Sequence, residues 1–495
     1  MPTSQELKTM CLAGQHEEAL TLALADLDAA PDNIWEQRKV GWVLYYMLSN
    51  DAEHQNATAF TTHLQILKEL NALNGQNEQM LFENIFWKIG ALLKNIPAEH
   101  HHAAKQIFDV LSGYSFNSSK AYSYMLKEYM KFEQWPGLVD FFAWWDLAKL
   151  SAEDAQPFKM NNGKTTISLA ERTYIAYAKA FLRAADVEKI TTFLPSIEQY
   201  AEQHPEMLYT SYYCGKLMLA SGTDLAVTMA NLLPFVLRKK GEFWVWQLLA
   251  EVYHADAEMQ LACLTRAVQC RTQEGFLVKI RLKLAQIYTN RKEYGRAKYQ
   301  LEKLHATYQK EGWRVPFEVQ GLLRMDWMAT AATDESHALD YVNLTNRILY
   351  QGAQSSVAVV VNVNQERRIF KVVYGERKQT NLRFSEANTR VNEGMLLTLY
   401  WKPRTNGDVE ILGCEHANQR PTSPLPYFKR LEGKVRINDG QTFGFLKQGN
   451  IHCYIGRNLI KNITNGQTLA VWAVLSLNTK KQEWCWSATA LCNKT

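Results

Sequence analysis

Apolar residues recur at helical spacing from the start of the chain to about position 350. They fall at i, i+3, i+4 and i+7, as in the run from Leu282 to Leu304, and proline and glycine are sparse. Sustained alternation of apolar and polar positions, which is typical of a half-buried strand, is essentially missing. The pattern predicts helices arranged in pairs, so we expect residues 1–351 to form an all-α domain.

The pattern changes at Gly352, where short runs rich in β-branched residues begin. Within 352–417 we predict five strands, at 357–361, 368–374, 380–384, 395–401 and 408–414. Within 431–495 we predict five more, at 432–436, 442–446, 451–455, 468–475 and 483–491. Five short strands in about 60 residues suit a small barrel of the OB type, so two such barrels are expected.

A proline-rich segment separates the two predicted barrels. Pro421, Pro424 and Pro426 lie too close together for a helix or a strand. We interpret residues 418–430 as a linker that is stiff enough to hold the two barrels apart. The predicted fold class is therefore multidomain, with an N-terminal all-α domain followed by two small five-stranded β-barrels.

Two helix pairs carry small and large residues at repeat-like offsets. Near the N-terminus, the small residues Gly14 and Ala19 let two helices approach closely, and the next helix opens near Ile34 after a proline. The second pair carries Leu284, Ala285, Tyr288, Tyr294, Ala297 and Leu301. Both segments resemble the tetratricopeptide repeat, although no strict repeat register fits between them. The resemblance implies a solenoid (TPR-like) whose surface binds an unidentified protein partner, while its aromatic residues form the core.

Composition and charge narrow the class of protein. The 495-residue chain has eight scattered cysteines without a CxxC pair, which is typical of reduced thiols in a cytoplasmic protein. We see no signal peptide and no apolar run long enough to span a membrane. The net charge is +10 from Gly352 to the end and −5 before it. Chance could distribute charge in this way, but a basic C-terminal region favours a partner with phosphates.

No catalytic or cofactor site is predicted. Gly163-Lys164-Thr165 resembles the end of a phosphate-binding loop, but Phe158 stands where the first glycine should be and no apolar strand precedes it. The run His100–His102 has no acidic or cysteine partners at helical spacing, so we predict no metal site there. We therefore expect a non-enzymatic protein without cofactors; an enzyme with an unfamiliar site in the helical domain is the least favoured alternative.

The candidate binding site lies in the last predicted barrel. Phe443 and Phe445 are two residues apart on one strand, and His452 and Tyr454 are two apart on the next, so each pair shares a face. Gly444 lets a neighbouring backbone approach closely. The alternative is that the phenylalanines face inward, but Val435, Ile437, Leu446 and Ile455 already supply the opposite face. Flat rings on an exposed face can stack on bases, and the nearby cations can neutralise phosphates: Lys434, Arg436, Lys447 and Arg457.

These residues resemble a cold-shock domain. Its Gly-Lys-Val start is present as Gly433-Lys434-Val435, and its two aromatic motifs fall on residues 441–446 and 451–455. The resemblance implies an OB barrel in which Phe443, Phe445, His452 and Tyr454 stack on the bases of single-stranded RNA or DNA. Two departures are Gln441-Thr442 in place of Lys-Gly and Ile437 in place of the usual tryptophan. We interpret the first barrel as a degenerate copy in which Arg368, Lys371 and other cations replace the aromatic run.

The layout of helical repeats followed by tandem cold-shock-like barrels is similar to a family of the TOTE-type bacterial conflict systems. This resemblance covers the whole chain in layout, whereas only about the last 60 residues carry specific motifs. It implies a role in defence against phage or other mobile elements. The leading hypothesis is an adaptor that binds single-stranded nucleic acid, with RNA favoured, and recruits a protein. The alternative is a pure protein-interaction scaffold in which the barrels dock protein.

Overall fold

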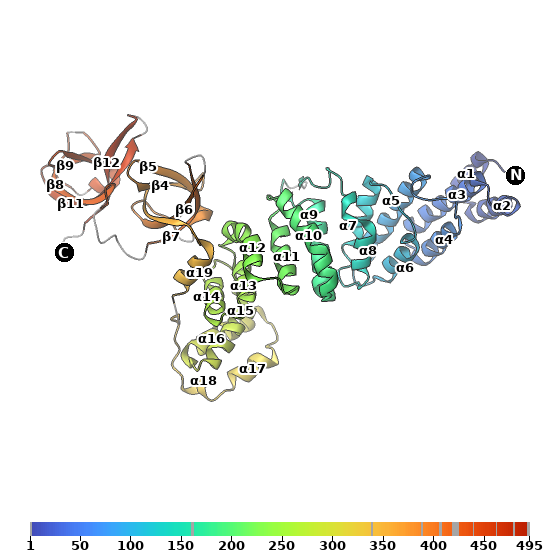
Figure 1. Cartoon of the computed structure of the whole chain (residues 1–495), viewed down its shortest axis with the longest axis horizontal. Helices are drawn as coiled ribbons and strands as arrows, with labels where there is room; N and C mark the ends of the chain where they lie inside the picture. The colour runs from blue at the N-terminus through green and yellow to red at the C-terminus, as the bar shows by residue number, and fades with distance from the viewer. Residues whose placement is uncertain are drawn as a thin grey trace. The chain divides into compact units, whose positions relative to one another are not determined.

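The computed structural model describes residues 2–159, 163–337, 340–387, 390–404, 408–417, 425–438, 440–461, 463–478 and 481–492. The chain forms two compact units, Met1–Leu232 and Leu233–Thr495. Helices make up most of the first unit, and the second unit contains helices followed by β-strands (Figure 1). The predicted change from α to β structure is confirmed. Among the described residues, no helix is long and apolar enough to cross a membrane.

The first unit is built from consecutive helices that pack on their neighbours. They are α1 (Ser4–Leu12), α2 (His16–Ala29), α3 (Ile34–Glu53), α4 (Ala57–Glu69), α5 (Gln79–Asn95), α6 (His102–Leu111), α7 (Lys120–Tyr129), α8 (Leu138–Trp145), α9 (Leu169–Ala184), α10 (Val187–Gln203) and α11 (Leu208–Ala220). Side chains cap the N-termini of several helices. Thr3 and Glu6 form a capping box at α1, and the Ser168 hydroxyl accepts a hydrogen bond from the backbone N–H of Glu171 at α9. One continuous apolar core runs through the unit from Leu7 to Met218.

A small hairpin interrupts these helices. It consists of β1 (Phe158–Lys159) and β2 (Thr165–Thr166), which pair antiparallel. Gly163, with a φ of +77°, precedes β2, so the sequence Gly163-Lys164-Thr165 leads into a strand and not into a helix. A phosphate-binding loop requires a strand followed by a glycine-rich loop and a helix, and this segment has a different geometry.

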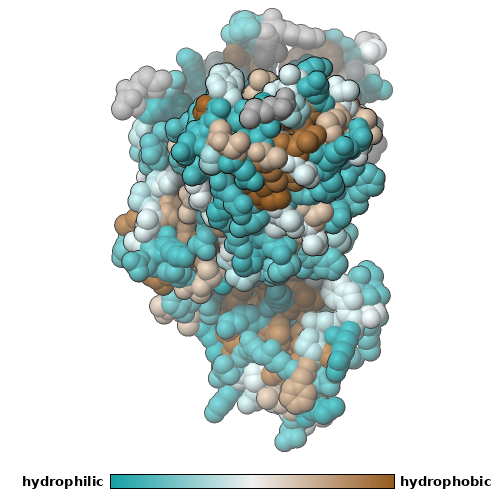
Figure 2. Space-filling model, turned by 90° about the vertical axis from the view of Figure 1, so that its right-hand side faces the viewer, coloured by the Kyte–Doolittle hydropathy of each residue, from teal (hydrophilic) through white to brown (hydrophobic). Residues whose placement is uncertain are grey.

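Apolar side chains are also exposed at the N-terminal end of the first unit. Figure 2 looks onto this end and shows a small hydrophobic area surrounded by hydrophilic side chains. Leu12 of α1 and Leu22 of α2 are among the exposed large hydrophobic residues. The free end of a stack of helical repeats usually has a polar outer face. The N-terminal end of this unit differs, because it also exposes apolar side chains.

The second unit begins with helices that continue from α12 (Leu225–Lys239), which crosses the boundary between the units. They are α13 (Phe243–Val252), α14 (Ala257–Val268), α15 (Val278–Asn290), α16 (Tyr294–Glu311), α17 (Phe317–Leu323), α18 (Trp327–Thr330) and α19 (Tyr341–Leu349). Five of the six residues that carried the second repeat-like match lie on α15 and α16 and are buried: Leu284, Ala285, Tyr288, Ala297 and Leu301. The sixth, Tyr294, is half-buried and stacks on Trp327. The helical pairing at this position agrees with the prediction.

Ten further strands form two five-stranded sheets. The first contains β3 (Gln354–Asn364), β4 (Ile369–Gly375), β5 (Lys378–Arg383), β6 (Leu396–Pro403) and β7 (Val409–His416), in the order β5-β4-β3-β6-β7. The second contains β8 (Phe428–Arg436), β9 (Gly444–Gln448), β10 (Ile451–Ile455), β11 (Thr468–Asn478) and β12 (Glu483–Leu491), and closes into a barrel in the order β10-β12-β11-β8-β9.

The two sheets share one connectivity but differ in closure. In the barrel, β10 and β12 pair in parallel through Cys453 and Trp486 and through Tyr454 and Ser487. At the corresponding place in the first sheet, the described residues form a single parallel bridge between Ala387 and Cys414. Among the residues that the structure describes, β8 to β12 close into a barrel, whereas the first β unit is a five-stranded sheet with the same strand order.

The two β units pack directly against each other. Tyr427, Phe428 and Val474 form one buried apolar cluster with Val359 and Val373 of the first sheet. The Tyr427 hydroxyl donates a hydrogen bond of 2.6 Å to the backbone carbonyl of Val357. The expectation that residues 418–430 hold the barrels apart is wrong, because Tyr427 and Phe428, at the start of β8, pack against the first sheet. Residues 418–424, which include Pro421 and Pro424, lie outside the described residues.

A buried polar cluster joins the helices of the second unit to the first sheet. Glu415 of β7 accepts hydrogen bonds from Arg266 of α14 at 2.8 Å and from the Tyr350 hydroxyl at 3.2 Å. Lys240, which is only 2% exposed, donates to the Tyr350 hydroxyl at 2.8 Å, and its burial lowers its pKa. The ring of Tyr350 stacks on Tyr400 of β6 at 3.9 Å. Side chains from distant parts of the sequence thus link the helices to the sheet.

Candidate nucleic-acid interface

The candidate site is the outward face of β8, β9 and β10. The strand register aligns Arg436, Phe445 and Tyr454 in one row across these strands. It aligns a second row of Lys434, Lys447 and His452. Because side chains alternate between the two faces of a strand, all six lie on the same side of the barrel wall. They are all exposed.

Three aromatic rings gather on this face. Phe445 and Tyr454 are 41% and 39% exposed as whole residues, and the centroids of their rings are 5.9 Å apart. The ring of Phe443 lies 5.9 Å from that of Phe445 and 5.7 Å from that of Tyr454. These rings are not stacked face to face on one another, and they are tilted by 41° to 90°. The ring faces of Phe445 and Tyr454 therefore remain accessible, and His452 lies one row away.

Phe443 differs from its predicted position. It was expected on the second strand of the barrel, but β9 begins one residue later, at Gly444. Its side chain is only partly exposed. Contact with both neighbouring rings nevertheless keeps it in the same group, where it supports Phe445 and Tyr454 from the edge.

The barrel core explains why these rings are left outside. Leu431, Val435, Leu446, Cys453 and Ile455 fill the interior from the opposite faces of the same strands. The alternative, in which the phenylalanines are core residues, does not fit this packing for Phe445. Burial among these apolar side chains raises the pKa of the Cys453 thiol to about 12.

Glycines allow β8 and β9 to approach closely beneath the site. A Cβ on Gly444 would lie 2.9 Å from the backbone oxygen of Arg436 and 2.6 Å from the side chain of Ile460. A Cβ on Gly433 would clash with the backbone oxygen of Lys447. The predicted role of Gly444 is therefore confirmed, and Gly433 has a similar one.

The four predicted cations surround the rings. Lys434, Arg436 and Lys447 lie on the aromatic face itself, and Arg457 opens the short helix α20 (Arg457–Ile460) directly after β10. Within the part of the chain that the structure describes, none of the four forms an ion pair with a carboxylate. By contrast, Arg430, near the start of β8, pairs with Glu432 at 3.0 Å. The basic charge beside the rings is thus free to meet an anion.

Two neighbours of the site were not predicted from the sequence. Ser487 of β12 lies beside Tyr454 through the parallel pairing of β10 and β12, and Thr468 of β11 lies opposite Lys434. Only the closed strand order reveals them, since neither belongs to an aromatic or basic pattern. They extend the two rows by one hydroxyl side chain each.

The corresponding face of the first sheet has a different character. Asn362, Lys371 and Asn381 form its central row across β3, β4 and β5. Val373, further along β4, is covered by the contact with the barrel. This face offers amides and a cation but no exposed ring in that row.

No metal centre is evident in the described ranges: no three His, Cys, Asp or Glu side chains gather closely enough to hold an ion. The side chains at the candidate site are aromatic, basic and hydroxyl groups. They can stack, neutralise anions and donate hydrogen bonds, and they are not the ligand set of a metal ion.

Two segments of the chain match models of known protein families. Residues 208–347 match the model of a domain of unknown function (DUF7017). Residues 429–491, which span nearly all of the barrel from β8 to β12, match the model of S1/CSD-like domain 2 of the TOTE conflict systems. No curated protein matches the chain. The predicted resemblance to the TOTE conflict systems is thereby confirmed for the C-terminal barrel, which is similar to one of their S1/CSD-like domains.

Proposed function

We propose that the chain is a non-enzymatic adaptor whose C-terminal barrel binds single-stranded nucleic acid, with RNA favoured over DNA. The observation that carries this proposal is the group of Phe443, Phe445 and Tyr454 on an exposed face that also bears His452 and unpaired cations. The match to a domain of the TOTE conflict systems supports a role in such a system.

The expected energetics suit binding with little sequence preference. Every base has a π-face, and each base stacked on an aromatic side chain contributes about 1–3 kcal/mol. Phe445 and Tyr454 would supply two such platforms, since both are substantially exposed. The row formed by Lys434, Lys447 and His452 lies beside them, within reach of a backbone whose bases occupy the rings.

The helical part is proposed to recruit a protein partner. Support comes from its exposed large apolar side chains, among them Leu12, Met80 and Phe317, because exposed apolar surface often marks interaction sites. We propose that the helices form a TPR-like array, in which stacked pairs present a continuous binding surface. The protein partner and the nucleic acid would then occupy different parts of the chain.

Salt dependence tests the role of the cations. We expect the log of the affinity for a short single-stranded RNA to fall steeply with the log of the salt concentration. Replacing Lys434 and Lys447 by glutamine should make that slope less steep by about 1.4, since each phosphate contact on a single strand contributes about 0.7. Filter binding over a salt series measures both slopes. Affinity that does not depend on salt would contradict the proposal and favour a barrel that docks protein.

A further inference from the structure

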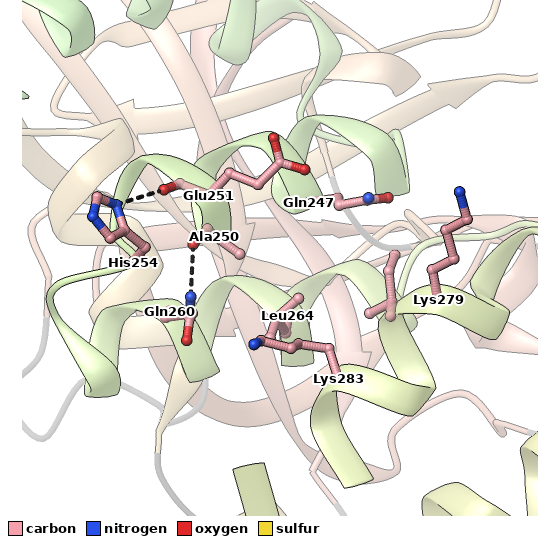
Figure 3. Close-up of a pocket in the computed structure, with 9 residues that line it drawn as sticks. Gln247, Ala250, Glu251, His254, Gln260, Leu264, Lys279 and Lys283 are labelled. Atoms are coloured by element: carbon pink, nitrogen blue, oxygen red, sulfur yellow. Dashed lines mark hydrogen bonds between the residues drawn. The ribbon is translucent and has the colours of Figure 1, made fainter. Parts of the chain in front are cut away.

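A groove crosses the helical part of the second unit, far along the chain from the barrel. It lies between α13, α14 and α15 and has a volume of about 340 Å³ (Figure 3). Ala250, Leu264 and Ile280 are among its lining residues, and all three are buried, so its floor is apolar. The groove falls within the segment that matches the domain of unknown function.

Two lysines stand at one edge of the groove. Lys279 and Lys283 are four residues apart on α15, so they share one face of that helix, and both are exposed. In the described residues neither pairs with a carboxylate, whereas Arg281 pairs with Glu274 and Arg291 with Glu258. The two lysines are therefore the cations of this helix that remain available to a ligand.

Local hydrogen bonds hold the opposite wall in place. The Gln260 side chain donates to the backbone carbonyl of Ala250 at 3.1 Å, and the His254 ring lies 3.1 Å from the backbone oxygen of Glu251 (Figure 3). Gln247 and Glu251 line this wall on α13. The amide of Gln247 can donate to the C=O groups and accept from the N–H groups of a peptide backbone.

We infer that this groove binds an extended acidic peptide segment of a protein partner, an inference that rests on the proposed recruitment of a partner by the helices. Residues four apart on a helix are about 6 Å apart along its axis. Alternate residues of an extended peptide are about 6.6 Å apart, so two carboxylates separated by one residue match the spacing at which Lys279 and Lys283 leave α15. The intervening side chain would face the apolar floor.

Nucleic acid fits the groove less well. The residues that line the groove include no Phe, Tyr or Trp, and the ring of His254 is held by its Nδ1 against the backbone oxygen of Glu251, so the groove has no group of stacking rings like that of the barrel. An acidic peptide has both the charge for the lysines and the apolar side chains for the floor.

Charge reversal in the full-length chain tests this inference. The probe is a fluorescein-labelled synthetic peptide of eight residues with glutamate alternating with leucine, and a second peptide of the same composition groups the glutamates together. We expect the alternating peptide to bind more tightly than the grouped one. The double variant Lys279→Glu/Lys283→Glu should lower its affinity about tenfold or more, measured by fluorescence anisotropy.

The matched control is Lys310→Glu, which reverses an exposed lysine of α16 outside the groove. It should leave peptide affinity unchanged, and single-stranded RNA should bind all variants equally. Equal binding of both peptides, or of the peptide to the wild type and the double variant, would overturn the inference about the groove while RNA binding by the barrel still stands. Loss of RNA affinity in the double variant would assign the lysines to nucleic acid instead.

Discussion

Replacing Phe445 and Tyr454 together by alanine is expected to weaken binding of a short single-stranded RNA about 30-fold or more. Each lost stack removes about 1–3 kcal/mol, and about 1.4 kcal/mol corresponds to a tenfold change in affinity. Both rings are exposed and lie in the same row of the barrel wall. Their removal should therefore reduce binding without opening a cavity in the core. Fluorescence anisotropy at fixed salt measures the effect.

The control for this experiment is Phe317→Ala, which removes a ring that is 87% exposed on α17. It should bind RNA as the wild type does, because it lies outside the barrel. Circular dichroism and the thermal midpoint establish that the double variant is folded. A folded double variant with wild-type affinity would be incompatible with a stacking site on this face.

Replacing Glu415 by alanine is expected to destabilise the second unit by about 3–5 kcal/mol, the cost of removing one partner of a buried ion pair. Glu415 is 7% exposed and accepts from both Arg266 and Tyr350. Without it, the guanidinium of Arg266 would remain buried without a carboxylate partner, bonded only to the side chains of Thr345 and Asn346 among the described residues. Urea unfolding followed by tryptophan fluorescence measures this change, since Arg266 lies over the ring of Trp246.

Lys240→Met serves as the matched control within the same cluster. Burial lowers the pKa of Lys240, so its charged form is disfavoured at this position. Methionine would keep most of the apolar chain, and Arg266 and Tyr350 would still bond Glu415. We expect an unfolding midpoint close to that of the wild type. If Glu415→Ala unfolds no more easily than Lys240→Met, the cluster does not stabilise the junction.

Local patterns predicted much of the β region. The strands at 451–455 and 483–491 have the predicted bounds, because β-branched and aromatic residues alternate there between clear turns. The exposed position of Phe445 also followed from the sequence. Successive side chains of a strand point to opposite faces, so Phe445 faces outward where Leu446 faces the core. Both arguments depend only on residues close together in the chain.

Contacts between distant segments could not be predicted in the same way. The start of β8 lies three residues before the predicted start of its domain, because Phe428 packs on the first sheet. Arg266 and Glu415 are separated by 149 positions, and neither belongs to a recognisable motif. The proline content of residues 418–430 suggested that the two β units are held apart. They are in contact instead, because Tyr427 and Phe428 pack on apolar side chains of the first sheet.

In the helical part, the sequence predicted the helices but not the groove between them. Periodicity predicted helices and the close pairing of α15 with α16, where small and large residues alternate at helical offsets. It could not predict the groove, because Lys279 and Lys283 belong to a common charge pattern on exposed helices. Their lack of ion-pair partners and their position beside an apolar floor become visible only when α13, α14 and α15 are packed together.

Photo-crosslinking tests the central claim most directly. Single-stranded RNA containing 4-thiouridine would be irradiated with the full-length protein, and mass spectrometry would identify the crosslinked residues. We expect crosslinks within residues 443–454, at Phe445, Tyr454 and their neighbours on the same face of β9 and β10. Crosslinks confined to the helices or to the first sheet would contradict the account. Crosslinking that did not exceed that of a control protein without a nucleic-acid site would also contradict it.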